Sequence, residues 1–365
     1  MKRVRIRAVA AGAAIALAAS LVAACGSSGD GGGGASNTGG APSSDAGGAP
    51  SSDAAPSSDA APSGETGGAS SQTGSEPSGG ASSETGSVPS GEAGGPIDLS
   101  KDTKKDITIP IAAGWDEDVA VSNLWKYVLE QKGYTVDLPT LDIAPVFKGV
   151  ASGDYDIFFD TWLPNTHKNY WKQFGDQVED IGTWYDSAPL TIAVPDYMDI
   201  DSMDQLKSIG DQVDKTIIGI DPGAGLTDVT QNSMMPAYGL DDWTLKTSST
   251  SAMLAALKKA TDDKKPIVVT LWRPHWAYGA FPIKDLKDPK GAMGKPDQIH
   301  VIGSKDFAKA DPGLVAALKN FTMDPDTLTD LETVVLRQYG DGKYQEGVKA
   351  WAADNQDFVD GLLGG

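Results

Sequence analysis

Large apolar residues are almost absent from residues 26–97, and this absence confines folding to the rest of the chain. The segment consists of Gly, Ser, Ala, Pro and Thr with scattered acids, in imperfect repeats such as "APSSDAAPSSDAAPSGETGG". Such a composition cannot bury enough apolar surface to offset the entropy of the chain. We therefore predict a disordered tether over residues 25–97, with a span of about 50 Å, and a folded part over residues 98–365.

The residues before the tether have the features of an export signal. Four basic residues occur within the first seven positions, and an apolar run of mostly small residues leads to "LVAAC". The run is too short and too rich in alanine to indicate a membrane span. Cys25 is the only cysteine of the chain, and the residues before it resemble the lipobox of bacterial lipoproteins. We predict a signal peptide over residues 1–24 and a lipid on Cys25, which would anchor the protein to the outer face of the cell membrane.

The charge of the folded part limits the classes of partner. The chain has a formal net charge of −20, of which the basic start contributes +4 and the tether −8, so residues 98–365 carry −16. Nucleic-acid binding needs basic patches that displace counterions, and an acidic surface disfavours it. We expect no nucleic-acid partner.

Short apolar strands alternate with amphipathic helices through the folded part. Strands are predicted at "DITIPIAA", "YTVDL", "YDIFF", "LTIAVP", "TIIGI" and "PIVVTLW", with helices between them and a mostly helical stretch from Asp311 onward. This order predicts an α/β architecture with largely parallel sheets. Ligands of such sheets bind beyond the carboxyl ends of the strands.

Patterns that would indicate an enzyme are missing from the folded part. It has no G-x-S-x-G sequence, its three histidines lack close metal-ligand spacing, and the turn "GIDPGAGLT" lacks the lysine of a phosphate-binding loop. Acidic runs such as "WDED" are interpreted as a solvated surface. We expect no catalysis, no metal and no cofactor.

Three tryptophans occur where predicted strands end, which indicates binding. Trp115 follows the first strand, Trp162 follows "YDIFF" in "DTWLPNTHKNYW", and Trp272 ends "PIVVTLW". Tryptophan faces attract cations, and several faces around one point suit a quaternary ammonium, which has no N–H to donate. A single tryptophan at a strand end can equally be a core residue, and the other six are interpreted as packing.

A site for an anion is predicted beside these tryptophans. The glycines of "DPGAGLTD" allow backbone N–H groups to approach a ligand, and the start of a helix attracts a carboxylate. His167, five residues after Trp162, can donate a hydrogen bond to the same carboxylate. A betaine, with a methylated ammonium and a carboxylate, would satisfy both groups of residues, although a glycine-rich turn can also be only a turn.

Four longer motifs resemble a known family. "GWDEDVAVSNLWKYVLEQKGY", "DTWLPNTHKNYW", "GIDPGAGL" and "LWRPHWAYGAFPIKDLKDPK" are similar to the glycine betaine/proline betaine substrate-binding proteins of ABC importers, over about residues 106–360. The resemblance implies a two-lobed type II periplasmic-binding-protein fold with a hinged ligand cleft. It implies a first lobe of residues 104–194 plus 304–365 and a second lobe of residues 195–303.

The resemblance also implies the residues and partners of the site. The ammonium would lie between Trp115, Trp162 and Trp272, and the carboxylate would be held by His167 and by the N–H groups of Gly225 and Leu226. The protein would pass a betaine to a permease and its ATPase for osmoprotection. The alternative is a stand-alone surface sensor or binding protein for quaternary ammonium compounds such as choline or carnitine.

Overall fold

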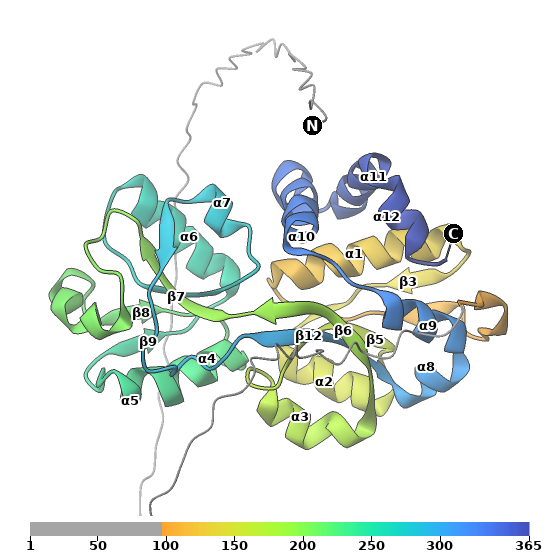
Figure 1. Ribbon diagram of the computed structural model, residues 1–365, viewed down its shortest axis with the longest axis horizontal. Coiled ribbons are helices and arrows are strands. Elements are labelled where there is room, and N and C mark those ends of the chain that lie inside the picture. The colour runs from red at the N-terminus through yellow and green to blue at the C-terminus, as the bar shows by residue number, and fades with distance from the viewer. Residues whose placement is uncertain (1–96, 365) are drawn as a thin grey trace, which may run out of the picture. The chain divides into compact units, whose positions relative to one another are not determined.

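The structure is a computed structural model, and it describes residues 97–364 (Figure 1). The predicted signal peptide, the predicted lipid on Cys25 and the tether up to residue 96 lie outside the described residues. Within residues 97–364, no helix is both long and apolar enough to cross a membrane.

The strands of the described part lie between Asp106 and Ser304. They are β1 Asp106–Thr108, β2 Ile111–Ala112, β3 Thr135–Asp137, β4 Thr140–Leu141, β5 Ile157–Leu163, β6 Val178–Ala188, β7 Leu190–Pro195, β8 Thr216–Ile218, β9 Thr244–Lys246, β10 Val269–Trp272, β11 Ile283–Asp285 and β12 Asp297–Ser304.

Helices fill most of the intervals between strands and the C-terminal part. The α-helices are α1 Asp116–Gln131, α2 Ile143–Ser152, α3 Lys168–Phe174, α4 Gly225–Val229, α5 Met235–Ala237, α6 Thr250–Asp262, α7 Ala277–Ala280, α8 Lys305–Ala310, α9 Pro312–Asn320, α10 Pro325–Glu332, α11 Tyr344–Asp354 and α12 Gln356–Gly361. Shorter 3₁₀ and π segments are η1 Leu99–Lys101, η2 Gly175–Gln177, η3 Met203–Gln212, η4 Thr230–Met234 and η5 Thr333–Tyr339.

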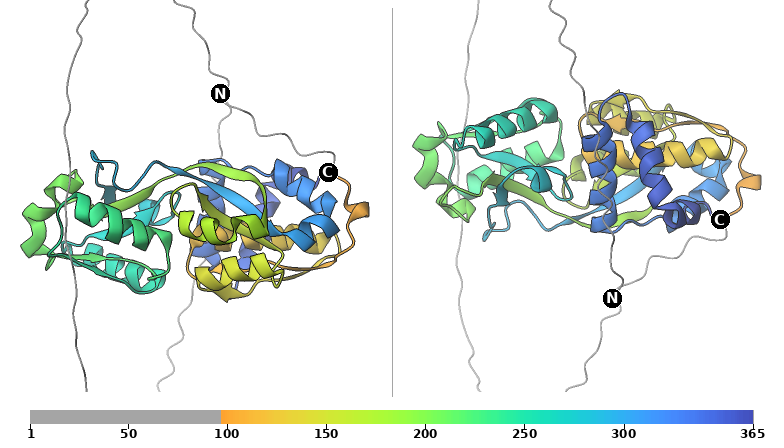
Figure 2. Two further views of the ribbon diagram at one scale, coloured as in Figure 1. Left: turned by 90° about the horizontal axis from the view of Figure 1, so that it is seen from below. Right: turned by 90° about the horizontal axis from the view of Figure 1, so that it is seen from above.

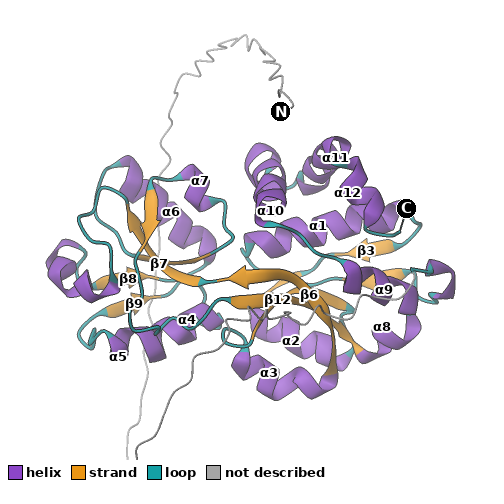
Figure 3. Cartoon of the chain, in the orientation of Figure 1, coloured by secondary structure: helices purple, strands orange, loops and turns teal. Residues whose placement is uncertain are grey.

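The elements form two lobes, as the sequence predicts. The second lobe contains a five-stranded sheet in the order β11-β7-β10-β8-β9, together with α4 to α7. The first lobe contains the three-stranded sheet β5-β12-β6, the pairs β1-β3 and β2-β4, and the remaining helices. Helices lie on both sides of the strands in each lobe (Figure 3), and α10 and α11 pack against α1 (Figure 2).

The lobes are joined by strands that leave one sheet and enter the other. β6 ends at Ala188 and β7 begins at Leu190, so the chain crosses to the second lobe almost without a loop. It returns through β12, which pairs with β5 and β6 of the first lobe. Because these crossings are extended and hydrogen-bonded, the two lobes are held by short connections that suit a hinge.

Two predictions about the sheets are wrong. The sheets are not largely parallel, because β12 runs antiparallel to both β5 and β6, and β7 runs antiparallel to β10 and β11. The segments "VEDIGTWYDSA" and "DQIHVIGS" form the crossing strands β6 and β12, although they lack the apolar runs that indicate buried strands. The sequence "DITIPIAA" also forms two strands, since Pro110 has no N–H to continue one ladder.

The boundary between the lobes differs from the sequence prediction at both crossings. Residues up to 194 were expected in the first lobe, yet β7 (Leu190–Pro195) pairs within the sheet of the second lobe. Only Pro189 separates it from β6, so no polar loop marks the crossing in the sequence. The second lobe was expected to extend to residue 303, yet β12 (Asp297–Ser304) already pairs with β5 and β6 of the first lobe.

The long helix α1 illustrates how the sequence places the site. Its first turn is acidic, which suits the positive end of a helix, and Gly133 after its end takes the left-handed conformation with φ of 82°. Its apolar face buries Trp125 against Phe159 and Phe321 in the core of the first lobe. This packing fixes the position of α1, and with it the start of the helix directly after Trp115.

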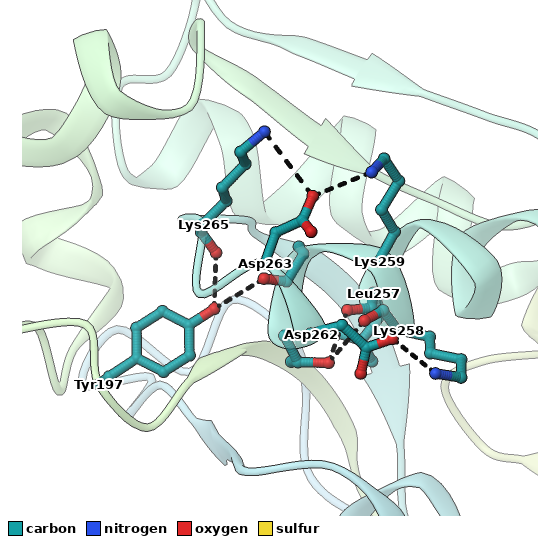
Figure 4. Close-up of polar contacts among 9 residues, drawn as sticks. Tyr197, Leu257, Lys258, Lys259, Asp262, Asp263 and Lys265 are labelled. Carbon is teal, nitrogen blue, oxygen red and sulfur yellow. Dashed lines mark hydrogen bonds and ion pairs between the residues drawn. The ribbon is translucent and has the colours of Figure 1, made fainter.

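The end of α6 is a polar surface of the second lobe (Figure 4). Lys258 pairs with Asp262 and Lys259 with Asp263, each four residues apart, while the Tyr197 hydroxyl donates to the carbonyls of Ala260 and Lys265. Exposed pairs of this kind stabilise a fold by well under about 1 kcal/mol each. None of these residues lines the pocket described below.

Candidate binding site between the lobes

A single pocket brings together all six residues predicted to bind the ligand. It has about 280 Å³ of empty volume. Its lining consists of Trp115, Glu117, Trp162, Thr166, His167, Leu190, Ile220, Ala224, Gly225, Leu226 and Trp272. Trp115, Trp162 and His167 belong to the first lobe, and Gly225, Leu226 and Trp272 to the second, so the pocket lies between the lobes.

The lobes touch each other on both sides of this pocket. On one side the Tyr170 hydroxyl donates to the carbonyl of Gly223 at 2.9 Å. On the other side the indole N–H of Trp276 donates to Asp116. The structure therefore describes a closed arrangement of the lobes.

The three tryptophans, which we call the cage, form the apolar walls of the pocket. Trp115 caps the start of α1, Trp162 is the penultimate residue of β5, and Trp272 is the last residue of β10. Their exposed fractions are 7%, 3% and 3%. The strand and helix ends thus hold three large aromatic side chains out of water, as a cation-binding cage requires.

His167 is a neutral hydrogen-bond donor facing the pocket. Its Nδ1 accepts the backbone N–H of Trp162 at 2.9 Å, so the proton of the neutral ring lies on Nε2. Burial lowers the pKa of His167 to about 3, which keeps the ring uncharged. Nε2 has no hydrogen-bond partner among the described residues. A buried donor without a partner is costly, and it marks a place where a ligand acceptor fits.

The loop that carries His167 is held by a residue of the returning strand. Asp297, at the start of β12, accepts the N–H groups of Asn165 and Thr166 at 2.6 and 2.9 Å and the Thr166 hydroxyl at 2.5 Å. Its side chain is buried. The crossing between the lobes therefore fixes the turn that precedes His167, which sequence patterns do not indicate.

Gly225 and Leu226 begin helix α4, directly opposite His167 across the cleft. The first N–H groups of a helix have no acceptor within it, so they are available to an anion. A Cβ on Gly225 would lie 2.1 Å from the carbonyl oxygen of Thr166. Only glycine allows the two lobes to approach this closely at this edge of the pocket.

Comparison with known proteins identifies the family. Residues 105–354 match the family model of the substrate binding domain of ABC-type glycine betaine transport systems. The protein belongs to this family. A glycine betaine/carnitine transport binding protein of Listeria monocytogenes is 42% identical over 158 residues, which are 43% of this chain and 51% of the relative. The match thus spans about half the length of that curated relative.

Solved structures of relatives have the same fold. Lactococcal OpuAC, in a closed form complexed with glycine betaine, is 33% identical with a TM-score of 0.64, covering 71% of this chain and all of the relative. A glycine betaine/L-proline-binding protein from Borrelia burgdorferi is 29% identical with a TM-score of 0.66, covering 70% of this chain and 96% of the relative. The predicted two-lobed periplasmic-binding-protein fold is confirmed.

This member of the family also has buried carboxylates at the cage, contrary to the sequence interpretation. The acids of "WDED" were expected on a solvated surface, whereas Glu117 and Asp118 are buried and Glu117 lines the pocket. Their position could have indicated their burial, because both lie in the first turn of the helix that follows Trp115. Side chains of a helix lean toward its N-terminus, which here lies at the cleft.

Each buried carboxylate near the cage has a raised pKa. Burial raises the pKa of Asp116 and of Asp160 to about 7. Burial, and then the charges of Asp160 and Glu332, raise the pKa of Glu117 well above its usual range. His275 is neutral, because burial lowers its pKa to about 3, and it packs edge-on against Trp272. No group of three or more His, Cys, Asp or Glu residues among residues 97–364 could hold a metal ion.

Proposed function

We propose that this protein is the extracytoplasmic receptor of an ABC importer and that it binds glycine betaine or a close relative in the pocket between its lobes. The cage would surround the methylated ammonium. The Nε2–H of His167 and the N–H groups of Gly225 and Leu226 would hold the carboxylate. The unpartnered Nε2–H of His167, buried next to three tryptophans, is the observation that carries the proposal.

Closure of the lobes would couple binding to transport. Each pole of the ligand would touch residues of both lobes, so the ligand binds the closed form better than the open one and shifts the protein toward it. A permease with its ATPase would receive the closed, loaded protein and import the betaine for osmoprotection. A lipid on Cys25 would hold the receptor at the outer face of the membrane, within reach of that permease.

The ligand class is tested by calorimetric titration of the purified protein with glycine betaine, glycine and choline. Glycine should bind far more weakly than its trimethyl form, because N–H groups inside an aromatic cage lose hydration without finding acceptors. Choline should bind more weakly than glycine betaine, since it has no anion for His167. Equal affinity for glycine and glycine betaine, or a preference for choline, would contradict the proposal.

The carboxylate half is tested by His167→Ala. A hydrogen bond to a charged group contributes about 1.5–3 kcal/mol, so the variant should bind glycine betaine about tenfold to a hundredfold more weakly. His300→Gln is the matched control, because His300 of β12 pairs with Asp180 of β6 and does not line the pocket. An unchanged affinity of His167→Ala would show that the carboxylate lies elsewhere.

A further inference from the structure

Two of the three cage tryptophans donate their indole N–H to a buried carboxylate. Trp162 donates to Asp160 Oδ1 at 2.6 Å, and Trp272 donates to Glu117 Oε2 at 2.9 Å. The exposed fractions of Asp160 and Glu117 are 0% and 1%. The cage is therefore backed by two acids at the edges of its rings.

Neither of these two carboxylates forms an ion pair within the described part of the protein. None of the ion pairs within residues 97–364 includes Asp160 or Glu117. The second oxygen of Asp160, Oδ2, is buried and has no hydrogen-bond partner there. Burying a carboxylate without a cation is costly, and the neighbouring charges make the cost larger. A cation between the indoles would remove much of that cost.

We propose that Asp160 and Glu117 form an anionic backing of the cage, which orients two indoles and attracts the positive charge of the ligand through them. This inference rests on the proposed function and deepens it. A carboxylate that accepts an indole N–H makes the ring faces more negative. Glu117 also lines the pocket itself, so its charge would act directly on the enclosed ammonium, whereas Asp160 would act through Trp162. The backing would make the pocket selective for the charge of the head group as well as for its shape.

The two acids act at different steps. Asp160 and Trp162 both belong to β5, so their bond exists whether the lobes are open or closed. Glu117 belongs to α1 of the first lobe and Trp272 to β10 of the second, so their bond forms only when the lobes close. Asp160 thus prepares the cage, and Glu117 completes it on closure.

The test compares two ligands of the same shape. Glycine betaine has a trimethylammonium head, and 3,3-dimethylbutanoate has a neutral tert-butyl group in its place on the same carboxylate. Asp160→Asn and Glu117→Gln keep an oxygen that accepts the indole N–H but remove the negative charge. Asp330→Asn is the matched control, because Asp330 accepts the indole N–H of Trp351 at 2.9 Å outside the pocket.

The ratio of the affinities for glycine betaine and 3,3-dimethylbutanoate, measured by calorimetric titration, should be about tenfold smaller in each of the two variants than in the parent. The decrease should come from weaker binding of glycine betaine. Asp330→Asn should keep the parental preference. Unchanged betaine affinity, or an equal loss for both ligands, would overturn the inference, because the acids would then only hold the rings. A parent that does not bind glycine betaine at all would instead refute the proposed function.

A measurement on the unmodified protein covers the case in which a variant does not fold. The enclosed cation should ionise the backing, so binding of glycine betaine near neutral pH should release protons, and binding of 3,3-dimethylbutanoate should not. Calorimetry in buffers with different heats of ionisation counts these protons. The other titratable groups that act on the two acids are Asp118 of α1, Glu332 of α10 and Tyr185 of β6. Proton counts that are equal for the two ligands would overturn the inference.

Discussion

Gly225→Ala should weaken ligand binding without weakening the fold. Gly225 has no positive φ, and it starts helix α4, so an alanine fits its backbone. In the closed arrangement, however, a Cβ there would lie 2.1 Å from the carbonyl oxygen and 2.7 Å from Cγ2 of Thr166. Thr166 belongs to the opposite lobe, so the clash exists only when the lobes close.

The size of the effect follows from these distances. Unbonded heavy atoms approach to about 3.5 Å, so the lobes must stay more than about 1 Å further apart at this point. Overpacking of a tight contact costs about 1–3 kcal/mol, which is about tenfold to a hundredfold in affinity. The exchange of Gly for Ala where the backbone permits it stabilises a protein by about 0.4–1 kcal/mol. We expect weaker binding together with an equal or higher melting temperature of the ligand-free protein.

The assay is calorimetric titration with glycine betaine, paired with a thermal melt of the ligand-free variant. Gly279→Ala is the control, because a Cβ at Gly279, in α7 of the same lobe, meets no atom within 4 Å. It should bind like the parent. Parental affinity in Gly225→Ala would refute the reasoning, since the lobes would then close without the contact between Gly225 and Thr166.

Further predictions concern the cage, the buried acids and the anchor. Replacing any one cage tryptophan by Ala should cost about 1–3 kcal/mol of betaine binding by calorimetry, and replacement by Phe should cost less, because one aromatic face remains; equal losses for Ala and Phe would contradict a cation-π role. The ligand-free protein should melt at a higher temperature at about pH 6.5 than at about pH 8, and its free energy of unfolding should be about 1–2 kcal/mol larger at the lower pH. The reason is that Asp116 and Asp160 have pKa values of about 7 in the folded protein, where they bind protons that the unfolded chain releases. A thermal melt that shows the opposite slope would contradict the raised pKa values of these two acids. Cys25→Ala should release the protein from membranes or leave it unprocessed, and a variant that stays bound and cleaved would exclude the lipid anchor.

Much of the fold is predictable because its elements obey local rules. The helix after Trp115 has an acidic first turn and a glycine after its end, and the strand before Trp272 is a continuous apolar run. The crossing strands β6 and β12 do not follow such rules. Their sequences lack a regular apolar pattern, and their place at the join between the lobes is set by tertiary contacts. Sheet direction therefore could not be predicted from local patterns.

The site divides in the same way. Aromatic residues at strand ends and a glycine-rich turn are visible in the sequence, and the structure brings them into one pocket. The carboxylates that hold the indoles were missed, because an acid in an acidic protein is ordinarily solvated. Asp297 was missed because its partners lie 131 and 132 residues away in the chain. Hydrogen bonds between distant segments leave no periodic signal in the sequence.

The division of the site between the lobes explains why both poles of the ligand matter for closure. The proposed ammonium site needs Trp272 of the second lobe beside Trp115 and Trp162 of the first. The proposed carboxylate site needs the α4 amides of the second lobe beside His167 of the first. A ligand can favour the closed form only by its extra affinity for that form. A betaine would gain this extra affinity from both its ammonium and its carboxylate, whereas a ligand with only one of these groups would gain only the part that this group contributes. Closure itself would therefore select for a compact molecule that carries both charges.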